Sequence, residues 1–334
     1  MSDRKILKRI FAVSIVSALT LSLIGFCNAN AAERVDTSKP VTITAKIDDN
    51  DQSVFASTYS GQVEINLYKL ANITETGDVE LLDKYSNSNI DLSVLNNNPT
   101  VEDVNTKIVE PAKRIADGTK PDETITIDKS TGAKSESITI ENGAGLYLYI
   151  PKDAADGRYK YSFTRYVLMA PTSEYISTGS GSDEWNYSSS FSLKSSEEER
   201  FGSLEIVKAL DSFNTSLGTA SFIYEVTAVR DNETVFNNVY SIDFTNAGNK
   251  SRVIDNIPAD SDVTVKELYS GASYSVKGDA SKNTKIIADK TVTTDFENDY
   301  DGRLISGGIS AENHFENEDG VINWIDASGN KVEQ

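Results

Sequence analysis

The chain has 334 residues, of which 51 are acidic and 32 basic, and its formal net charge is −19. So acidic a chain repels phosphate backbones and anionic lipid surfaces, which excludes nucleic acid as an expected partner. Its single histidine, His314, and single cysteine, Cys27, exclude zinc clusters and most histidine-based catalysis. We therefore expect no cofactor, no metal site and no ordinary enzyme activity.

The first residues have the features of a secretory signal peptide. Four basic residues between Arg4 and Arg9 precede an apolar run from Ile10 to Phe26, and Ala29-Asn30-Ala31 supplies the small residues before a cleavage site. An uncleaved membrane anchor is the alternative, but the run is short for a spanning helix. We expect residues 1–31 to be removed, and the mature chain to be secreted and to have no membrane span. Because Cys27 leaves with the signal, the mature chain has no disulfide and needs another source of stability.

Strand patterns dominate the first half of the mature chain. One helix is expected between Pro99 and Asp117, with Thr100 as its N-cap and Pro111 ending or kinking it. The polar stretch Ser195–Arg200 lacks periodicity and is predicted to be a linker. Residues 32–195 therefore form a first β domain with a helical insertion. Its predicted strands are Val41–Ile47, Val63–Leu67, Ile138–Ile140, Gly145–Ile150 and Tyr159–Met169.

Short strands with no helix between them fill residues 201–300. Turn residues separate these strands, and this pattern is typical of a β-sandwich. We expect an all-β chain with two Ig-like β-sandwich domains in tandem, and residues 301–334 as a terminal strand or a tail. The predicted strands of the second domain are Leu204–Leu210, Ala220–Arg230, Thr234–Phe244, Ser251–Ile254, Val263–Tyr269, Ala272–Lys277, Lys285–Ile287 and Val292–Tyr300.

Three polar residues of the second domain occupy positions where an apolar residue is expected. Residues two apart in a strand share a face. This rule puts Lys208 of the first strand, Glu267 of a middle strand and Asn298 of the last strand on faces that are otherwise apolar. Each alone would be explained by snorkelling, a solvated edge or a buried Lys–Glu salt bridge. Their coincidence in one domain favours a chemical reaction between them.

The predicted reaction is an intramolecular isopeptide bond. Burial lowers the pKa of a lysine and raises that of a glutamate. A neutral Lys208 amine can then attack the Asn298 carboxamide, while a protonated Glu267 hydrogen-bonds the carbonyl and moves protons. The bond would close a loop of 90 residues (298 − 208). By analogy with a disulfide, such a loop stabilises the fold by about 4–5 kcal/mol.

These three residues lie in motifs that resemble the signature strands of Cna B-type domains, the Ig-like modules of Gram-positive surface adhesins and pilins. The motifs are Gly202–Lys208, Val263–Glu267 and Phe296–Asn298. The resemblance implies a Lys208–Asn298 bond with Glu267 as its catalyst. The run after Glu267 lacks the family's usual proline. Asn313 is a rival acceptor because it lies in a similar run, Glu312–Phe315.

Residues 40–195 resemble the first domain of sortase-assembled pilins, through Ile65–Ala71, Gly145–Leu148 and Tyr161–Phe163. Trp185 and Lys194 match the two ends of the pilin motif W-x3-V-x-V-Y-P-K, in which the lysine accepts another subunit. The intervening positions differ, so an ordinary surface lysine is the alternative for Lys194. Lys69 shares a face with apolar residues and is a second candidate for an internal bond, although we identify no partner for it.

The sequence therefore predicts an extracellular structural protein of a Gram-positive-type bacterium. It would be a pilin-like or adhesin-associated subunit whose partners are other surface or pilus subunits and a sortase. The alternative is an adhesin module that binds a host matrix protein or a glycan. Tyr147, Tyr149, Tyr159 and Tyr161 could form a sugar-stacking surface for it, but tyrosines in alternating strands more often pack across strands. No proline follows a leucine, so we expect no sortase anchoring signal of the LPxTG type.

Overall fold

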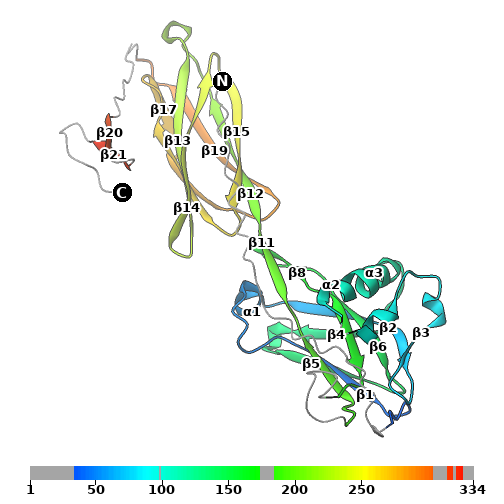
Figure 1. Cartoon of the computed structure of the whole chain (residues 1–334). Helices are drawn as coiled ribbons and strands as arrows, with labels where there is room; N and C mark the ends of the chain where they lie inside the picture. The colour runs from blue at the N-terminus through cyan, green and yellow to red at the C-terminus, as the bar shows by residue number, and fades with distance from the viewer. Residues whose placement is uncertain (1–33, 98, 174–183, 304–313, 319–320, 326–334) are drawn as a thin grey trace. The chain divides into compact units, whose positions relative to one another are not determined.

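The computed structural model describes residues 34–97, 99–173, 184–303, 314–318 and 321–325. The predicted signal peptide and the rival acceptor Asn313 lie outside these residues. The chain divides into two compact units, which we call unit 1 (residues 1–198) and unit 2 (residues 199–334). Both are built mainly from strands (Figure 1). The predicted all-β class, with two domains and a helical insertion in the first, is confirmed.

The described part of unit 1 contains one five-stranded and two three-stranded sheets, and we call the three-stranded sheet that includes a strand of only two residues the small sheet. The first sheet has the strand order β10-β1-β5, the second has β3-β2-β6-β9 with β4 also paired to β2, and the small sheet has β11-β8-β7. The strands are β1 (Val41–Lys46), β2 (Gln62–Ile73), β3 (Val79–Leu81), β4 (Glu123–Asp128), β5 (Ser135–Ile140), β6 (Gly145–Pro151), β7 (Ala154–Ala155), β8 (Tyr159–Phe163), β9 (Tyr166–Ala170), β10 (Ser188–Ser192) and β11 (Ser195–Glu199).

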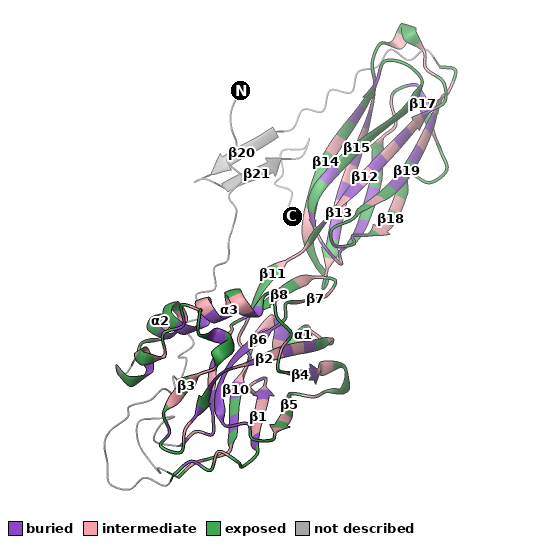
Figure 2. Ribbon diagram, turned by 90° about the vertical axis from the view of Figure 1, so that its right-hand side faces the viewer, coloured by how far each residue is buried: buried purple, intermediate pink, exposed green. Residues whose placement is uncertain are grey.

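The core of unit 1 follows from side-chain alternation. In β1, Val41, Ile43 and Ala45 are fully buried while the residues between them are partly exposed, so one face of the strand lies in the core. β6 is a central strand, paired with β2 and β9 at its two edges, and it is buried along almost its whole length. Figure 2 marks the buried residues along these strands in purple. Apolar residues of both larger sheets belong to one continuous cluster.

The expected helix between Pro99 and Asp117 exists but continues through its proline. It consists of α2 (Val101–Val104), a π-helical turn η3 (Asn105–Val109) and α3 (Glu110–Ala116). Thr100 and Asp103 form a capping box at its start. Pro111 was expected to end or kink the helix, but it lies in the first turn of α3, directly after the wider π turn. A missing N–H is tolerated in a first helical turn, so the helix continues.

The other helical segments of unit 1 are short. Ser53 caps α1 (Val54–Thr58) by accepting a hydrogen bond from the Ala56 amide. The remaining ones are the 3-10 turns η1 (Asp83–Tyr85), η2 (Leu92–Asn97) and η4 (Lys129–Thr131). Among the described residues, no helix has the length and apolar character needed to cross a membrane.

The boundary between the two units falls inside the predicted linker Ser195–Arg200, but most of this segment is a strand and not an irregular connection. β11 covers Ser195–Glu199 and pairs with β8 in unit 1, and β12 starts at Phe201 in unit 2. No side chain of β11 is fully buried. Its sequence therefore carries no hydrophobic alternation, and the strand is defined by its pairing with β8 rather than by an apolar face.

Unit 2 is a sandwich of two four-stranded sheets with the orders β15-β12-β19-β17 and β14-β13-β16-β18. β12 and β19 run parallel, and the other pairs are antiparallel. One 3-10 turn, η5 (Thr215–Leu217), precedes β13. The strands are β12 (Phe201–Leu210), β13 (Ala220–Arg230), β14 (Glu233–Phe244), β15 (Gly248–Pro258), β16 (Asp262–Tyr269), β17 (Tyr274–Lys277), β18 (Ser281–Lys285) and β19 (Thr291–Tyr300).

Seven of these eight strands overlap well with the predicted segments, and β18 is displaced. It was predicted at Lys285–Ile287 but covers Ser281–Lys285. The run Ser-Lys-Asn-Thr-Lys has no apolar residue, because β18 is an edge strand whose side chains stay at least partly exposed. The buried Ile286, which was part of the predicted strand, comes directly after the observed one.

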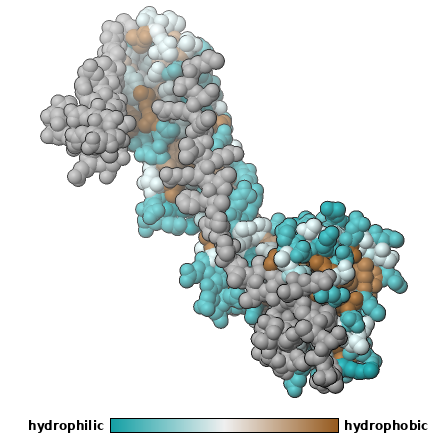
Figure 3. Space-filling view, in the orientation of Figure 1, coloured by the Kyte–Doolittle hydropathy of each residue, from teal (hydrophilic) through white to brown (hydrophobic). Residues whose placement is uncertain are grey.

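Beyond unit 2's sandwich, β20 (His314–Glu318) and β21 (Val321–Ile325) pair with each other as an antiparallel two-stranded sheet. In the view of Figure 3, hydrophilic residues cover most of the visible described surface of each unit. This agrees with the acidic composition of the chain.

Candidate functional site

Lys208, Glu267 and Asn298 lie together in the core of unit 2. Their residue exposures are 0%, 6% and 0%. β12 and β19 are parallel neighbours in one sheet, with Lys208 opposite Phe296, and Asn298 two residues further along. Lys208 and Asn298 therefore project from the same sheet into the sandwich. Glu267 reaches them from β16 of the opposite sheet.

An irregularity in β16 accompanies the inward position of Glu267. Tyr224 of β13 pairs with Glu267, but the next residue, Ile223, pairs with Tyr269. Leu268 is thus an extra residue on β16, and it is 49% exposed. Such a bulge bends a strand and re-aims the neighbouring side chains, and bulges are common next to reactive sites.

The acid lies between the amine and the amide. Both carboxylate oxygens of Glu267 are 3.2 Å from Lys208 Nζ. Glu267 Oε1 also accepts a hydrogen bond of 2.7 Å from Asn298 Nδ2. One oxygen atom therefore contacts both the nitrogen that would attack and the nitrogen that would leave. This is the geometry that a proton shuttle requires.

The orientation of the Asn298 amide differs from the expected one. We expected Glu267 to hydrogen-bond the carbonyl oxygen, but it contacts the amide nitrogen instead. The second hydrogen of that nitrogen faces the backbone carbonyl of Ser270, at 3.3 Å. Asn298 Oδ1 has no hydrogen-bond partner among the described residues. Since the Ser270 carbonyl can only accept a hydrogen bond, the nitrogen and not the oxygen fits at that position.

Burial shifts the pKa of both charged groups toward their neutral forms. Burial lowers the pKa of Lys208 to about 8, although the carboxylate of Glu267 opposes this shift. Burial likewise raises the pKa of Glu267, against the effect of Lys208. The rings of Phe222 and Tyr224 lie 4.6 and 5.8 Å from Lys208 Nζ and replace water around it. A neutral amine beside a neutral acid is therefore accessible near neutral pH.

The sequence did not identify three contributors to this site. Phe222, Tyr224 and Val226 are two residues apart on β13 and so share one face. This apolar face could have shown from the sequence that they point into the core. The third contributor is the Ser270 carbonyl. A backbone atom leaves no signal in residue type, so only the structure reveals it.

Lys69 has no amide side chain as a partner among the described contacts. It lies on β2 next to a register shift. Its Nζ is 3.5 Å from the backbone oxygen of Asn142, and burial lowers its pKa. The nearest acid, Asp122, accepts a hydrogen bond from the Lys69 amide and pairs with Lys84. No described hydrogen bond joins Lys69 to an amide side chain, and its role in a second internal bond stays a prediction.

Lys194 is committed to an ion pair. Its Nζ is 3.2 Å from Asp48 Oδ2, and its side chain is 37% exposed. Ser192 donates a hydrogen bond to the same carboxylate. Side chains alternate before Lys194, because Ser189, Phe191 and Leu193 are buried while the residues between them are at least partly exposed. No contact of Lys194 tests its role as an acceptor for another subunit, which stays a prediction.

The tyrosines proposed as a sugar-binding surface are mostly in the core, so that interpretation was wrong. Tyr147, Tyr149 and Tyr161 are 1%, 7% and 1% exposed. Tyr149 stacks on Phe191 with ring centroids 3.9 Å apart. The hydroxyl of Tyr161 donates to Asp156. Alternating tyrosines in these strands therefore serve packing.

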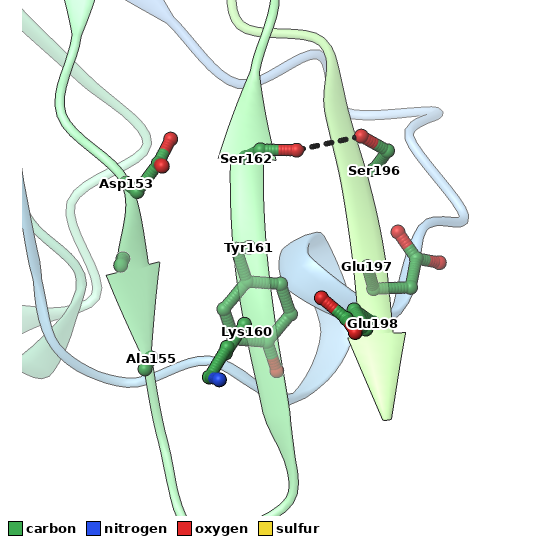
Figure 4. A pocket seen from close by; sticks show the side chains of 9 residues that line it. Asp153, Ala155, Lys160, Tyr161, Ser162, Ser196, Glu197 and Glu198 are labelled. Carbon is green, nitrogen blue, oxygen red and sulfur yellow. Dashed lines mark hydrogen bonds between the residues drawn. The ribbon is translucent and has the colours of Figure 1, made fainter. Parts of the chain in front are cut away.

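An open pocket of 420 Å³ lies against β7, β8 and β11 of unit 1. Figure 4 shows Asp153, Glu197 and Glu198 around it, together with Lys160 and the hydrogen bond between Ser162 and Ser196. An open pocket with several carboxylates is typical of a solvated acidic surface. We assign no activity to it.

Comparisons with known proteins agree with this division of the chain. Residues 204–301 match a family described as a domain of unknown function, DUF5979. This match covers nearly the same residues as the resemblance to Cna B-type domains, which it does not test. No curated protein matches the chain.

Several solved structures are similar to the chain over most of its length. They include the minor pilin GBS52 of Streptococcus agalactiae, with 13% identity, 81% of this chain and 100% of that chain covered, and a TM-score of 0.23. The shaft pilin SpaA of Lactobacillus rhamnosus GG has 11% identity, coverages of 80% and 99%, and a TM-score of 0.25. The basal pilin SpaE of the same organism has 11% identity, coverages of 78% and 99%, and a TM-score of 0.28. These neighbours are Gram-positive pilins, and at such identities and TM-scores we draw nothing about function from the likeness itself.

Proposed function

We propose that this protein is an extracellular structural subunit, pilin-like or adhesin-associated, whose unit 2 is stiffened by an isopeptide bond between Lys208 and Asn298. One observation carries the proposal. Glu267 Oε1 contacts both Lys208 Nζ and Asn298 Nδ2 inside a buried site. A buried Lys–Glu pair alone would not explain a buried asparagine amide whose leaving nitrogen lies on the same carboxylate.

The proposed reaction starts from the neutral amine of Lys208 and the protonated carboxyl of Glu267. The amine attacks Asn298 Cγ and forms the new C–N bond. Glu267 gives its proton to Nδ2, the Cγ–Nδ2 bond breaks, and ammonia leaves. The carboxylate then takes the surplus proton from Nζ, so Glu267 ends as it began. The protein is its own substrate and reacts once.

The proposed bond has a clear structural benefit. It would join the first and last strands of the unit 2 sandwich, which are already parallel neighbours. The mature chain would have no cysteine if residues 1–31 are removed, so a disulfide is not available to it. An amide bond closes a comparable loop and needs no oxidant. This suits a load-bearing protein outside the cell.

The alternative role as a glycan-binding adhesin has less support, because three of the four tyrosines named for it are buried. Export and surface localisation rest on the predicted signal peptide. The partners that we propose are other surface or pilus subunits, joined with the help of a sortase. Lys194 is the candidate acceptor, once its ion pair with Asp48 opens.

The decisive test is the intact mass of the mature chain. We expect a mass lower than that of the unmodified sequence by one ammonia, and a crosslinked peptide containing Lys208 and Asn298 after proteolysis. A mass equal to the unmodified sequence would refute the bond. For the subunit role, co-expression with a sortase and partner subunits should give denaturant-resistant ladders that contain this chain. Their absence with all components present would count against that role.

A further inference from the structure

The buried amide of Asn298 can point in two directions, and only one suits the reaction. In the observed direction its nitrogen faces Glu267, which can protonate it as it leaves. In the reverse direction the oxygen would face Glu267, and the leaving nitrogen would have no proton donor beside it. The two directions differ by a half-turn of the amide plane.

The backbone carbonyl of Ser270 distinguishes the two directions. It lies 3.3 Å from Asn298 Nδ2 and can only accept a hydrogen bond. Glu267 cannot discriminate as strictly, because its protonated form can donate to an oxygen and its ionised form can accept from a nitrogen. In the reverse direction, the carbonyl of Ser270 would face Asn298 Oδ1, and two buried acceptors would repel each other.

We propose that the Ser270 carbonyl selects the reactive direction of the Asn298 amide, and that Gly271 is the positioning residue that holds this carbonyl in place. This inference rests on the proposed crosslinking reaction. The role of the Ser270 carbonyl is separate from that of Glu267, which moves the protons.

The local structure explains why a glycine occupies position 271. Its φ is +85°, a left-handed conformation that side chains rarely adopt. A Cβ at this position would lie 2.8 Å from Cδ2 of the Tyr274 ring. That ring is buried between the rings of Phe222 and Tyr300, at 5.7 and 6.0 Å, so it has little room to move away. Any side chain at position 271 therefore shifts the backbone that carries the Ser270 carbonyl.

The test compares Gly271→Ala with Gly218→Ala in the full chain. Gly218 is also in unit 2 and has a φ of +71°, but a Cβ there would meet no atom within 4 Å. Both substitutions thus place a side chain at a positive φ, and they differ in the contact with Tyr274. Freshly translated chains are incubated at neutral pH, and the fraction that has lost ammonia is followed by intact mass. Thermal unfolding of each variant confirms that it is folded at the assay temperature.

We expect Gly271→Ala to lose ammonia about tenfold more slowly than the wild type, because one hydrogen bond that orients the reacting group is weakened. Gly218→Ala should react at the wild-type rate. A merely structural role would not change the rate, since a variant that remains almost fully folded presents the same site. A second control is the wild-type protein in enough urea to lower its free energy of unfolding to that of Gly271→Ala. It measures how much the loss of stability alone slows the reaction.

If Gly271→Ala does not fold, Gly271→Asn replaces it, because asparagine tolerates a left-handed backbone better and still presents a Cβ to Tyr274. A folded position-271 variant that reacts at the wild-type rate would overturn the inference, as would an equal slowing in Gly218→Ala. A wild-type chain that loses no ammonia would instead refute the crosslink itself.

Discussion

Replacing Asn298 by alanine removes the acceptor of the proposed bond while leaving the Lys208–Glu267 ion pair in place. This makes the variant a direct measure of what the bond contributes. The closed loop spans 90 residues (298 − 208). Loop-closure entropy for that length corresponds to about 4.6 kcal/mol. For a unit of this size, each kcal/mol moves the unfolding midpoint by about 4–8 °C, so unit 2 should melt about 20–35 °C lower in the variant.

Differential scanning calorimetry of the whole mature chain is the appropriate assay, because unit 1 has its own core and provides an internal reference. Only the transition of unit 2 should move, and intact mass should show no loss of ammonia. Asn283→Ala is the matched control. Asn283 is exposed on β18 and accepts a hydrogen bond from Thr264, so its loss should cost about 0.5 kcal/mol or less.

Two outcomes would refute this reasoning. If Asn298→Ala destabilises unit 2 no more than Asn283→Ala does, then no covalent loop is lost with Asn298. If the variant and the wild type both retain the mass of their unmodified sequences, the three residues form a buried polar cluster without chemistry.

Glu267→Gln should abolish the loss of ammonia, because glutamine cannot carry protons between the two nitrogens. It should also destabilise unit 2 by about 3–5 kcal/mol beyond the lost bond, because it removes one partner of a buried ion pair. A crosslinked Glu267→Gln protein would contradict the shuttle. The rate of ammonia loss should not depend on pH while Lys208 and Glu267 together hold one proton. It should fall as the pH rises above about 8, because Lys208 then loses its proton. It should also fall in acid, below the raised pKa of Glu267, because both groups are then protonated. A rate that keeps rising above pH 9 would show that the acid is not required in its protonated form. Thr100→Ala should lower the stability of unit 1 alone, by about 1 kcal/mol, because it removes the capping box of α2. Thr106→Ala, an exposed position further along the same helix, is its calorimetric control, and an equal effect of both would exclude a capping role.

The sequence by itself determined the fold class, most strands of unit 2 and the identity of the three central residues. These inferences depend on one local property, the period of two in a strand, which assigns each side chain to a face without knowledge of the partner strand. A lysine, a glutamate and an asparagine on apolar faces were visible in this way. β18 and β11 were misjudged because edge or exposed strands carry no hydrophobic alternation.

Only the tertiary structure decided which groups meet and in which direction they point. It paired Lys194 with Asp48 and placed three tyrosines, considered as a surface, in the core. It also placed the nitrogen of Asn298 between Glu267 and the backbone carbonyl of Ser270. Contacts of this kind join residues far apart in the chain or involve atoms common to every residue. Residue type and spacing carry no record of either.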